Sequence, residues 1–211
     1  MTINTCTRIA AVLAASMGLS AFAADQKLTA PEVEKGKQYL EQTRNYVIGA
    51  TKGLSETQWK FKTAPDRWSI AEILEHMVLT QELVLGPVRA QLAKSGAKAV
   101  DTKQVDAAIV NLFPDRSTKF KAPDMLVPTG RWTPAEALDR LNKNYDSLIE
   151  YLTSTPDLRE HVVEALPLKA LTKGAYDSMD GYEWVLASGG HTERHTLQML
   201  EVKADTHFPA K

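Results

Sequence analysis

Two histidines four residues apart, His191 and His195, are the side chains of this 211-residue chain best placed to do chemistry. Residues with this spacing project from one face of an α-helix, because each residue advances by about 100°. Neutral imidazole is the commonest protein ligand for transition metals. The pair can therefore supply two of the ligands that a tetrahedral or octahedral metal site needs.

Glu193 lies between the two histidines in the sequence but falls near the opposite side of the helix, so we expect it to be solvated. The pattern His-x-Glu-x-His also differs from both His/Glu spacings that zinc proteases use on a helix. A zinc protease is therefore not indicated.

A third imidazole comes from another predicted helix. His76 shares a helix face with Ile73, Thr80 and Leu83, which turns it toward the core of a helical protein. A single histidine of this kind can bind a backbone carbonyl instead, but three buried imidazoles without partners are costly, and one metal satisfies all three. We predict a divalent metal at His76, His191 and His195. The set suits Zn, Ni, Fe or Mn and does not decide among them.

Other polar residues near this set are less suited to chemistry. Glu72 shares a face with His76 but belongs to a helix cap, and Gln198 shares a face with His191 but cannot accept a proton. We expect His161, in a polar loop, and His207, near the end of the chain, to be solvated. No general base is evident.

Gly189 and Gly190 stand inside the predicted helix, where each costs about 1 kcal/mol relative to alanine. Either close packing of another element or room for a ligand beside His191 would explain the pair.

Four capping signatures mark the starts of the long helices. In each, a side-chain oxygen precedes a glutamate by three residues, so that cap and glutamate can bond to each other's backbone amides. The four caps are Thr29, Ser69, Thr133 and Asp180. Helical periodicity then predicts helices to about Gly53, Gly96, Thr155 and Ala204. Alternation long enough for a sheet is absent, so we predict an all-α four-helix bundle.

The connections differ in length. Residues 54–67 form a short one, whereas 97–131 form a long one between the second and third helices, with a short helix expected over 101–112. A connection of that length either crosses a bundle or covers a site. Residues 156–179 form a second irregular stretch.

The first 23 residues are typical of a secretory signal peptide. A nearly continuous apolar run from Ile9 to Leu19 precedes Ala21-Phe22-Ala23, a small-residue cleavage pattern, and the run is too short to span a membrane. We therefore predict cleavage near Ala23, one domain over residues 24–211, export to the periplasm or medium, and no membrane association after cleavage. The one cysteine, Cys6, lies in this leader, which excludes disulfides and cysteine nucleophiles from the mature chain.

The composition is that of an ordinary globular protein, with 44% hydrophobic and 24% charged residues. A net charge of −1 and the lack of any Lys/Arg run exclude a basic nucleic-acid-binding surface. We expect no nucleic acid among the partners.

Two stretches together resemble the DinB-like superfamily: Trp-Ser-Ile-Ala-Glu-Ile-Leu-Glu-His over residues 68–76 and His-Thr-Glu-Arg-His-Thr-Leu-Gln over 191–198. The resemblance covers nearly all of residues 24–211. It implies an antiparallel-type four-helix bundle with a long crossover, a divalent metal on His76, His191 and His195, and often a homodimer. Relatives include bacillithiol S-transferases and mycothiol-dependent isomerases, where the metal activates a thiol cofactor. Those thiols belong to the cytoplasm, whereas the leader predicts export, and the two expectations conflict.

Two functional hypotheses follow from the predicted site. The first is a metal-dependent hydrolase or transferase acting on a small molecule, because three neutral ligands leave a divalent ion its full charge and an open position. The second is a non-catalytic metal-binding or stress-related helical module. A helical interaction protein without metal would require all three histidines to be structural.

Overall fold

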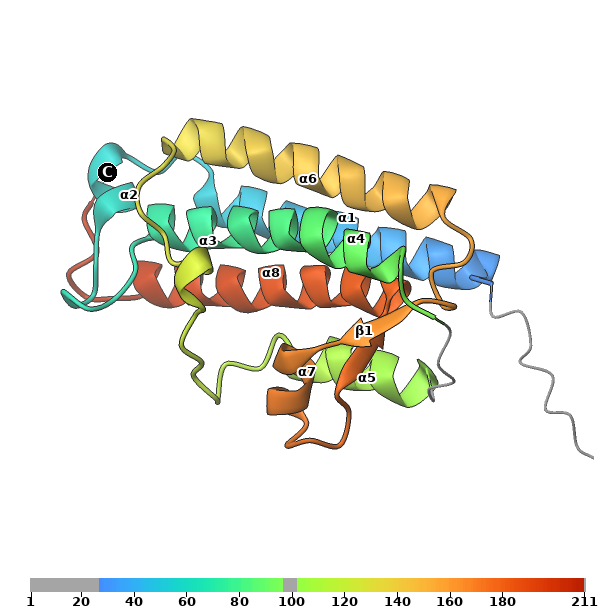
Figure 1. Ribbon diagram of the computed structural model, residues 1–211. Helices are drawn as coiled ribbons and strands as arrows, with labels where there is room; N and C mark the ends of the chain where they lie inside the picture. Colours follow the sequence, from blue (N-terminus) through green and yellow to red (C-terminus); the bar gives the residue numbers. More distant parts are fainter. Residues whose placement is uncertain (1–26, 97–101, 211) are drawn as a thin grey trace, which may run out of the picture.

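The computed structural model describes residues 27–96 and 102–210; the predicted signal peptide, with Cys6, lies outside them. Four long helices form the bundle (Figure 1): α1 (Ala30–Thr51), α3 (Ile70–Leu83), α6 (Pro134–Ser154) and α8 (Gly181–Lys203). Helix α1 contacts α8 and α6, and α3 contacts the same two. The prediction of an all-α four-helix bundle is confirmed.

The long connection between α3 and α6 is required because these two helices run in the same direction. In Figure 1 both α3 and α6 run from left to right, so the chain must return along the bundle between them. Helix α5 (Thr102–Leu112), where a short helix was expected, lies on this return path and packs against α8, followed by the 3₁₀ turn η2 (Asp124–Leu126) beside α3. The connection both crosses the bundle and covers α8.

All four predicted caps are present, each as a reciprocal capping box. At the start of α8, Asp180 Oδ1 accepts from the Glu183 amide at 2.7 Å, and Glu183 Oε2 accepts from the Asp180 amide at 2.7 Å. These bonds satisfy amides that have no partner inside the helix, which is why the helices begin where the caps stand.

Two shorter features were not predicted from the sequence. The connection between the first two long helices contains helix α2 (Glu56–Lys60), capped by a Ser55–Gln58 box. Residues 156–179, expected to be irregular, contain the antiparallel strands β1 (Val162–Glu164) and β2 (Ser178–Asp180), with helix α7 (Leu166–Leu171) between them. Strands of three residues are too short for alternation to be recognised, so the sequence did not indicate this small sheet, and the all-α class is unaffected.

The second long helix is continuous but not regular. The π-helical segment η1 (Val84–Val88) and helix α4 (Arg89–Leu92) prolong α3, as the prediction of a helix to about Gly96 requires. Pro87 lies inside η1 and has no amide hydrogen to donate, and the wider π-helical turn accommodates it. Within the described residues, no helix combines the length and apolarity that a membrane crossing requires.

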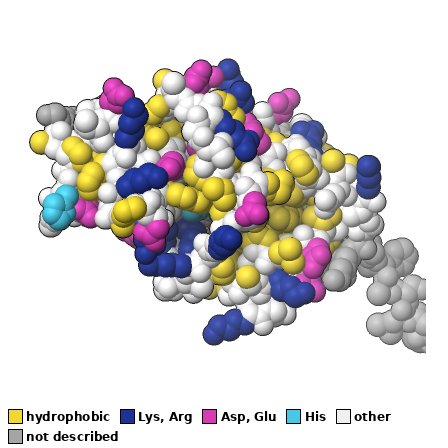
Figure 2. All heavy atoms as spheres, turned by 60° about the vertical axis from the view of Figure 1, so that its left-hand side comes forward, with side chains coloured by type: hydrophobic (Ala, Val, Ile, Leu, Met, Phe, Trp, Pro, Cys, Tyr) yellow, Lys and Arg dark blue, Asp and Glu magenta, His cyan; other side chains and the backbone are white. Residues whose placement is uncertain are grey.

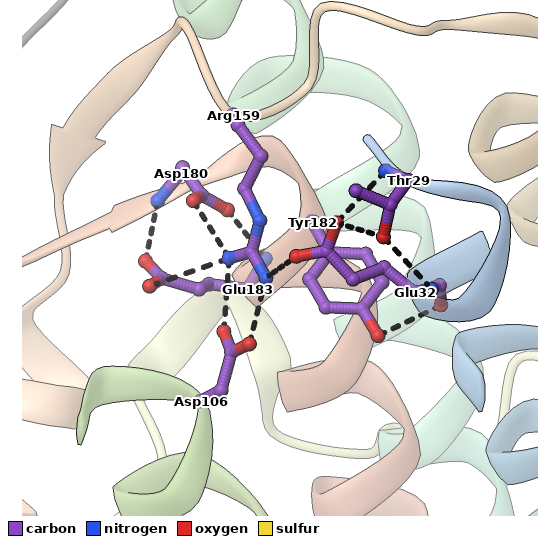
Figure 3. Close-up of polar contacts among 7 residues, drawn as sticks. All are labelled: Thr29, Glu32, Asp106, Arg159, Asp180, Tyr182 and Glu183. Atoms are coloured by element: carbon purple, nitrogen blue, oxygen red, sulfur yellow. Dashed lines mark hydrogen bonds and ion pairs between the residues drawn. The ribbon is translucent and has the colours of Figure 1, made fainter. Parts of the chain in front are cut away.

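Arg159 joins the starts of α1 and α8 to α5 (Figure 3). Its guanidinium is 4% exposed and donates to both oxygens of Asp106, at 2.9 and 2.7 Å, to Asp180 at 2.9 Å and to Glu32 at 2.8 Å. Glu183 lies 3.7 Å away. Three of these carboxylates belong to capping boxes, so one buried cation links two helix caps. Burial and the neighbouring Asp180 raise the pKa of Glu183, which favours its protonated form in this cluster.

The glycine pair of α8 is explained by close packing. A Cβ on Gly189 would lie 2.8 Å from Cε1 of Tyr39 on α1, and one on Gly190 would lie 2.8 Å from Cβ of Phe113, which follows α5. Both distances are below van der Waals contact, so the two glycines let α1 and the end of α5 approach α8. Of the two explanations that the sequence left open, packing is confirmed.

We therefore expect Gly190→Ala to destabilise the fold by about 1 kcal/mol or more, because overpacking costs about 1–3 kcal/mol and outweighs the better helix propensity of alanine. The matched control is Gly49→Ala in α1, where an added Cβ meets nothing within 4 Å. Denaturant unfolding should show the control equal to or more stable than the wild type; a stabilised Gly190→Ala would contradict the packing explanation.

Candidate metal centre

The three predicted histidines converge in the middle of the bundle. His76 comes from α3 and is buried, while His191 and His195 come from successive turns of α8, with His195 buried and His191 partly exposed. One ligand nitrogen from each lies within 4.8 Å of the others, and His76 Nε2 is 3.2 Å from His191 Nε2. Within residues 27–96 and 102–210, this is the group of His, Cys, Asp or Glu side chains that could hold a metal ion.

Hydrogen bonds at the far side of two rings orient them. His76 Nδ1 donates to the carbonyl of Leu126 at 2.8 Å, and His195 Nδ1 donates to Gln198 Oε1 at 2.8 Å. A carbonyl can only accept, so each Nδ1 carries the proton and each Nε2 keeps its lone pair. This is the arrangement in which a neutral imidazole binds a metal through Nε2.

The surroundings keep the rings neutral. Burial lowers the pKa of His76, and burial together with His195 and His76 lowers the pKa of His191 well below its usual value. Burial and His76 lower the pKa of His195 to about 3. The folded protein therefore presents unprotonated ligands at neutral pH, and a cation is the species that three converging acceptors favour.

The remaining predicted residues lie elsewhere, and two of them differ from expectation. Glu193 was predicted to be solvated but is partly buried, and its Oε2 accepts from the Tyr39 hydroxyl at 3.0 Å. His161 was also predicted to be solvated, yet its Nδ1 contacts the carbonyl of Ser95 at 2.9 Å. His207 is exposed as expected, and Glu72 is held in its capping box with Ser69.

The structure adds Glu75, whose role the sequence did not suggest. This carboxylate is 3% exposed and accepts from the backbone amides of Thr129 and Gly130, each at 2.9 Å, and of Arg131 at 3.2 Å. The bonds fasten the end of the crossover to α3, three residues after the Leu126 carbonyl that orients His76. No local signal could reveal this, because the partners lie more than fifty residues away in the sequence.

Glu75→Gln should lower metal affinity by about tenfold, the lower end of what loss of an outer-shell partner costs. The glutamine NH₂ would face backbone donors, so the crossover would shift and the Leu126 carbonyl would leave His76. Competition with a chromophoric chelator measures the change. The control is Glu82→Gln on the same helix, where the side chain is 38% exposed; equal affinities for the two variants would show that Glu75 does not support His76.

The three histidines face a cavity of about 830 Å³. Its walls come from α3, α7, α8 and the segment between α5 and η2, and on this face Figure 2 shows hydrophobic side chains gathered in a hollow with Lys and Arg side chains beside it. Thr80 and Ser188 also line the cavity near the histidines. The site is therefore open to a molecule larger than water.

Comparison with known proteins identifies the family of the chain. The model of the DinB superfamily matches residues 39–199, which include all three histidines. The chain is 26% identical to the uncharacterized protein YuaE of Bacillus subtilis (strain 168) over 153 residues, which cover 72% of this chain and 87% of that protein. No solved structure matches the chain significantly. On the strength of the family match, the chain belongs to the DinB superfamily.

Proposed function

We propose that this protein is a divalent-metal-dependent enzyme, a hydrolase or transferase that acts on a small molecule. The observation that carries the proposal is the position of the three imidazoles at the wall of a large cavity. A structural metal site is closed by protein ligands, whereas a catalytic one keeps a position open for substrate. Three protein ligands beside open space correspond to the second kind.

The residues fit a metal ion. His76 and His195 hold their Nε2 lone pairs toward the same region, and His191 Nε2 lies 3.2 Å from that of His76, so the donor set is three neutral nitrogens. Zn, Ni, Fe and Mn all accept such ligands. When bound, the ion would supply a Lewis acid that polarises a carbonyl or lowers the pKa of a coordinated group.

The protein's own part is orientation and binding. The Leu126 carbonyl and Gln198 fix two rings, and the cavity leaves room for a substrate beside them. Glu72 and Glu75, the acidic residues nearest His76 in α3, are both engaged in other hydrogen bonds, so neither is free to act as a general base. This favours a reaction in which the substrates bring the proton-accepting group, as in transfer to an ionisable nucleophile.

We also propose export and a homodimer. Export is supported by the leader-like composition of residues 1–23, and places the mature domain at 24–211. The homodimer is supported by family resemblance, and the exposed Leu197 and Leu200 of α8 offer apolar area for it. Fractionation with mass analysis of the N-terminus tests the first, and light scattering of the purified protein tests the second.

The test of the enzymatic function is a turnover screen of the metal-loaded protein with small esters, anilides and electrophile–thiol pairs. We expect one class to be turned over, with activity lost on chelation and in His195→Ala and kept in His207→Ala, whose side chain is exposed. Bound metal without turnover in any class would favour the alternative, a non-catalytic metal-binding module.

A further inference from the structure

The cavity beside the three histidines has two chemically different ends. Helices α3 and α8 run in opposite directions there, since His76 meets His195 while Gln81, further along α3, contacts Thr192, earlier in α8, at 3.5 Å. The C-terminal end of α3 therefore lies beside the N-terminal end of α8. The lining residues can be followed in both directions from the metal-binding group.

In one direction the lining is mainly apolar, apart from Glu164, which ends β1 two residues before Leu166. Leu83 ends α3 and Val84 begins η1, Trp184 lies on α8, and Leu166 and Leu171 of α7 complete the wall. With a helical rise of about 1.5 Å per residue, the wall extends about 10–12 Å from the histidines. Burying apolar surface against such a wall is favourable by about 25 cal/mol per Å².

In the other direction cationic side chains stand among apolar ones such as Phe113 and Phe120. The segment after α5 contributes Arg116, Lys119 and Lys121, the turn before α3 contributes Arg67, and α8 contributes Arg194. Among the residues that the structure describes, two carboxylates line the cavity, Asp66 and Glu164.

These positive charges are incompletely neutralised. Glu201 forms a two-pronged ion pair with Arg116, at 2.6 and 2.7 Å. Arg67 lies 4.0 Å from Asp66. Arg194 donates to the backbone carbonyls of Asp115 and Thr118 and also lies near the Asp115 carboxylate. Within the described residues Lys119 and Lys121 form no such ion pair, so this end keeps a net positive charge. The cationic end therefore attracts a negative group.

We infer that the substrate is a small amphipathic anion, with a carboxylate or phosphate head group at the cationic end and an apolar body of up to about 12 Å along the wall of α3, α7 and α8. This deepens the proposed function, since such a molecule passes the three histidines between its head and its body. A bond between the two parts is thereby placed beside the metal-binding group. Polar sugars and cationic molecules do not fit this distribution.

The test is a calorimetric binding series on the purified metal-loaded protein with octanoate, octyl phosphate, octanol, octylammonium and butanoate. We expect octanoate or octyl phosphate to bind about tenfold or more tighter than octanol, as charge-assisted contacts require, and octylammonium not to bind. The gain from butanoate to octanoate should be at most about fourfold per methylene. Whichever of octanoate and octyl phosphate binds more tightly identifies the head group.

Two variants separate the ends. Lys119→Gln combined with Lys121→Gln should lower the affinity for the anions about tenfold and leave the affinity for octanol unchanged, because only the head group meets these charges. Leu166→Gln should lower the affinity for every eight-carbon ligand by the same factor. Leu166 is 65% exposed, so the fold tolerates the change. The matched controls are Lys35→Gln, which is exposed on α1, and Ile48→Gln, which is 42% exposed on α1; neither residue lines the cavity.

Repeating the series after chelation locates the head group. A preference for anions that persists supports the cationic end, whereas one that vanishes with the metal would place the head group on the ion and overturn the inference. Equal binding of octanoate and octanol would overturn it as well. Metal content measured on the same samples keeps the two proposals apart, because a protein without metal contradicts the enzymatic function, while a metal-loaded protein without anion preference contradicts only the substrate class.

Discussion

Arg159→Met is expected to destabilise the protein by about 3–5 kcal/mol, the cost of leaving buried charges without their partner. Arg159 contacts Asp106, Asp180 and Glu32 at 2.9 Å or less, and Glu183 is close by. Methionine fills much of the same space but removes the one cation of this cluster. The loss should appear as a lower midpoint in denaturant, with α1, α5 and α8 no longer held together at one end.

The difference in unfolding free energy between the wild type and Arg159→Met should become smaller as the pH falls. Without Arg159 the buried carboxylates have folded-state pKa values above their unfolded ones, so the folded state binds more protons, and stability decreases as pH rises from the unfolded pKa toward the folded one. The variant should therefore be closest to the wild type near pH 5 and furthest from it near pH 8. The control is Lys143→Met, whose ion pair with Asp139 is solvent-exposed and should be worth less than about 1 kcal/mol. A pH-independent deficit would show that lost packing, not charge, dominates.

Adding a divalent ion to chelator-treated wild-type protein is expected to raise the unfolding temperature strongly. An ion that binds only the folded state contributes about 4 kcal/mol at a thousandfold excess over its dissociation constant. The three imidazoles have lowered pKa values and remain unprotonated near pH 7, so protons do not compete for them there. Differential scanning fluorimetry with Zn, Ni, Fe(II) and Mn ranks the metals.

Variants determine whether the shift comes from the proposed site. His76→Ala and His195→Ala should lose most of the metal-dependent shift, and His207→Ala, whose ring is exposed, should keep it. A full shift retained by both ligand variants would place the ion elsewhere.

An interaction could be predicted from the sequence when its two partners are close together along the chain. The caps at Thr29, Ser69, Thr133 and Asp180 bond to residues three positions on, so the starts of the long helices were readable. The Ser55–Gln58 box is equally local, and α2 could have been recognised from it. Helical periodicity also aimed His76, His191 and His195 inward, and the structure brings them together.

The interactions that the sequence did not reveal are the distant ones. Arg159 reaches partners 21 to 127 residues away, and Glu75 binds amides more than fifty residues downstream. Glu193 turns away from the site as expected, but the Tyr39 hydroxyl of α1 meets it there, so it is not solvated. Only the fold decides which element covers each helix face, and for that reason the outer shell of the site had to come from the structure.

The central claim, one divalent ion held by three histidines, is tested most directly by elemental analysis of the purified protein. We expect about one equivalent of a transition metal per chain in the wild type and in His207→Ala, and close to none in His76→Ala and His195→Ala, since three protein ligands define the site. A metal-free wild type that takes up no added ion, or a full equivalent retained by both ligand variants, would contradict it.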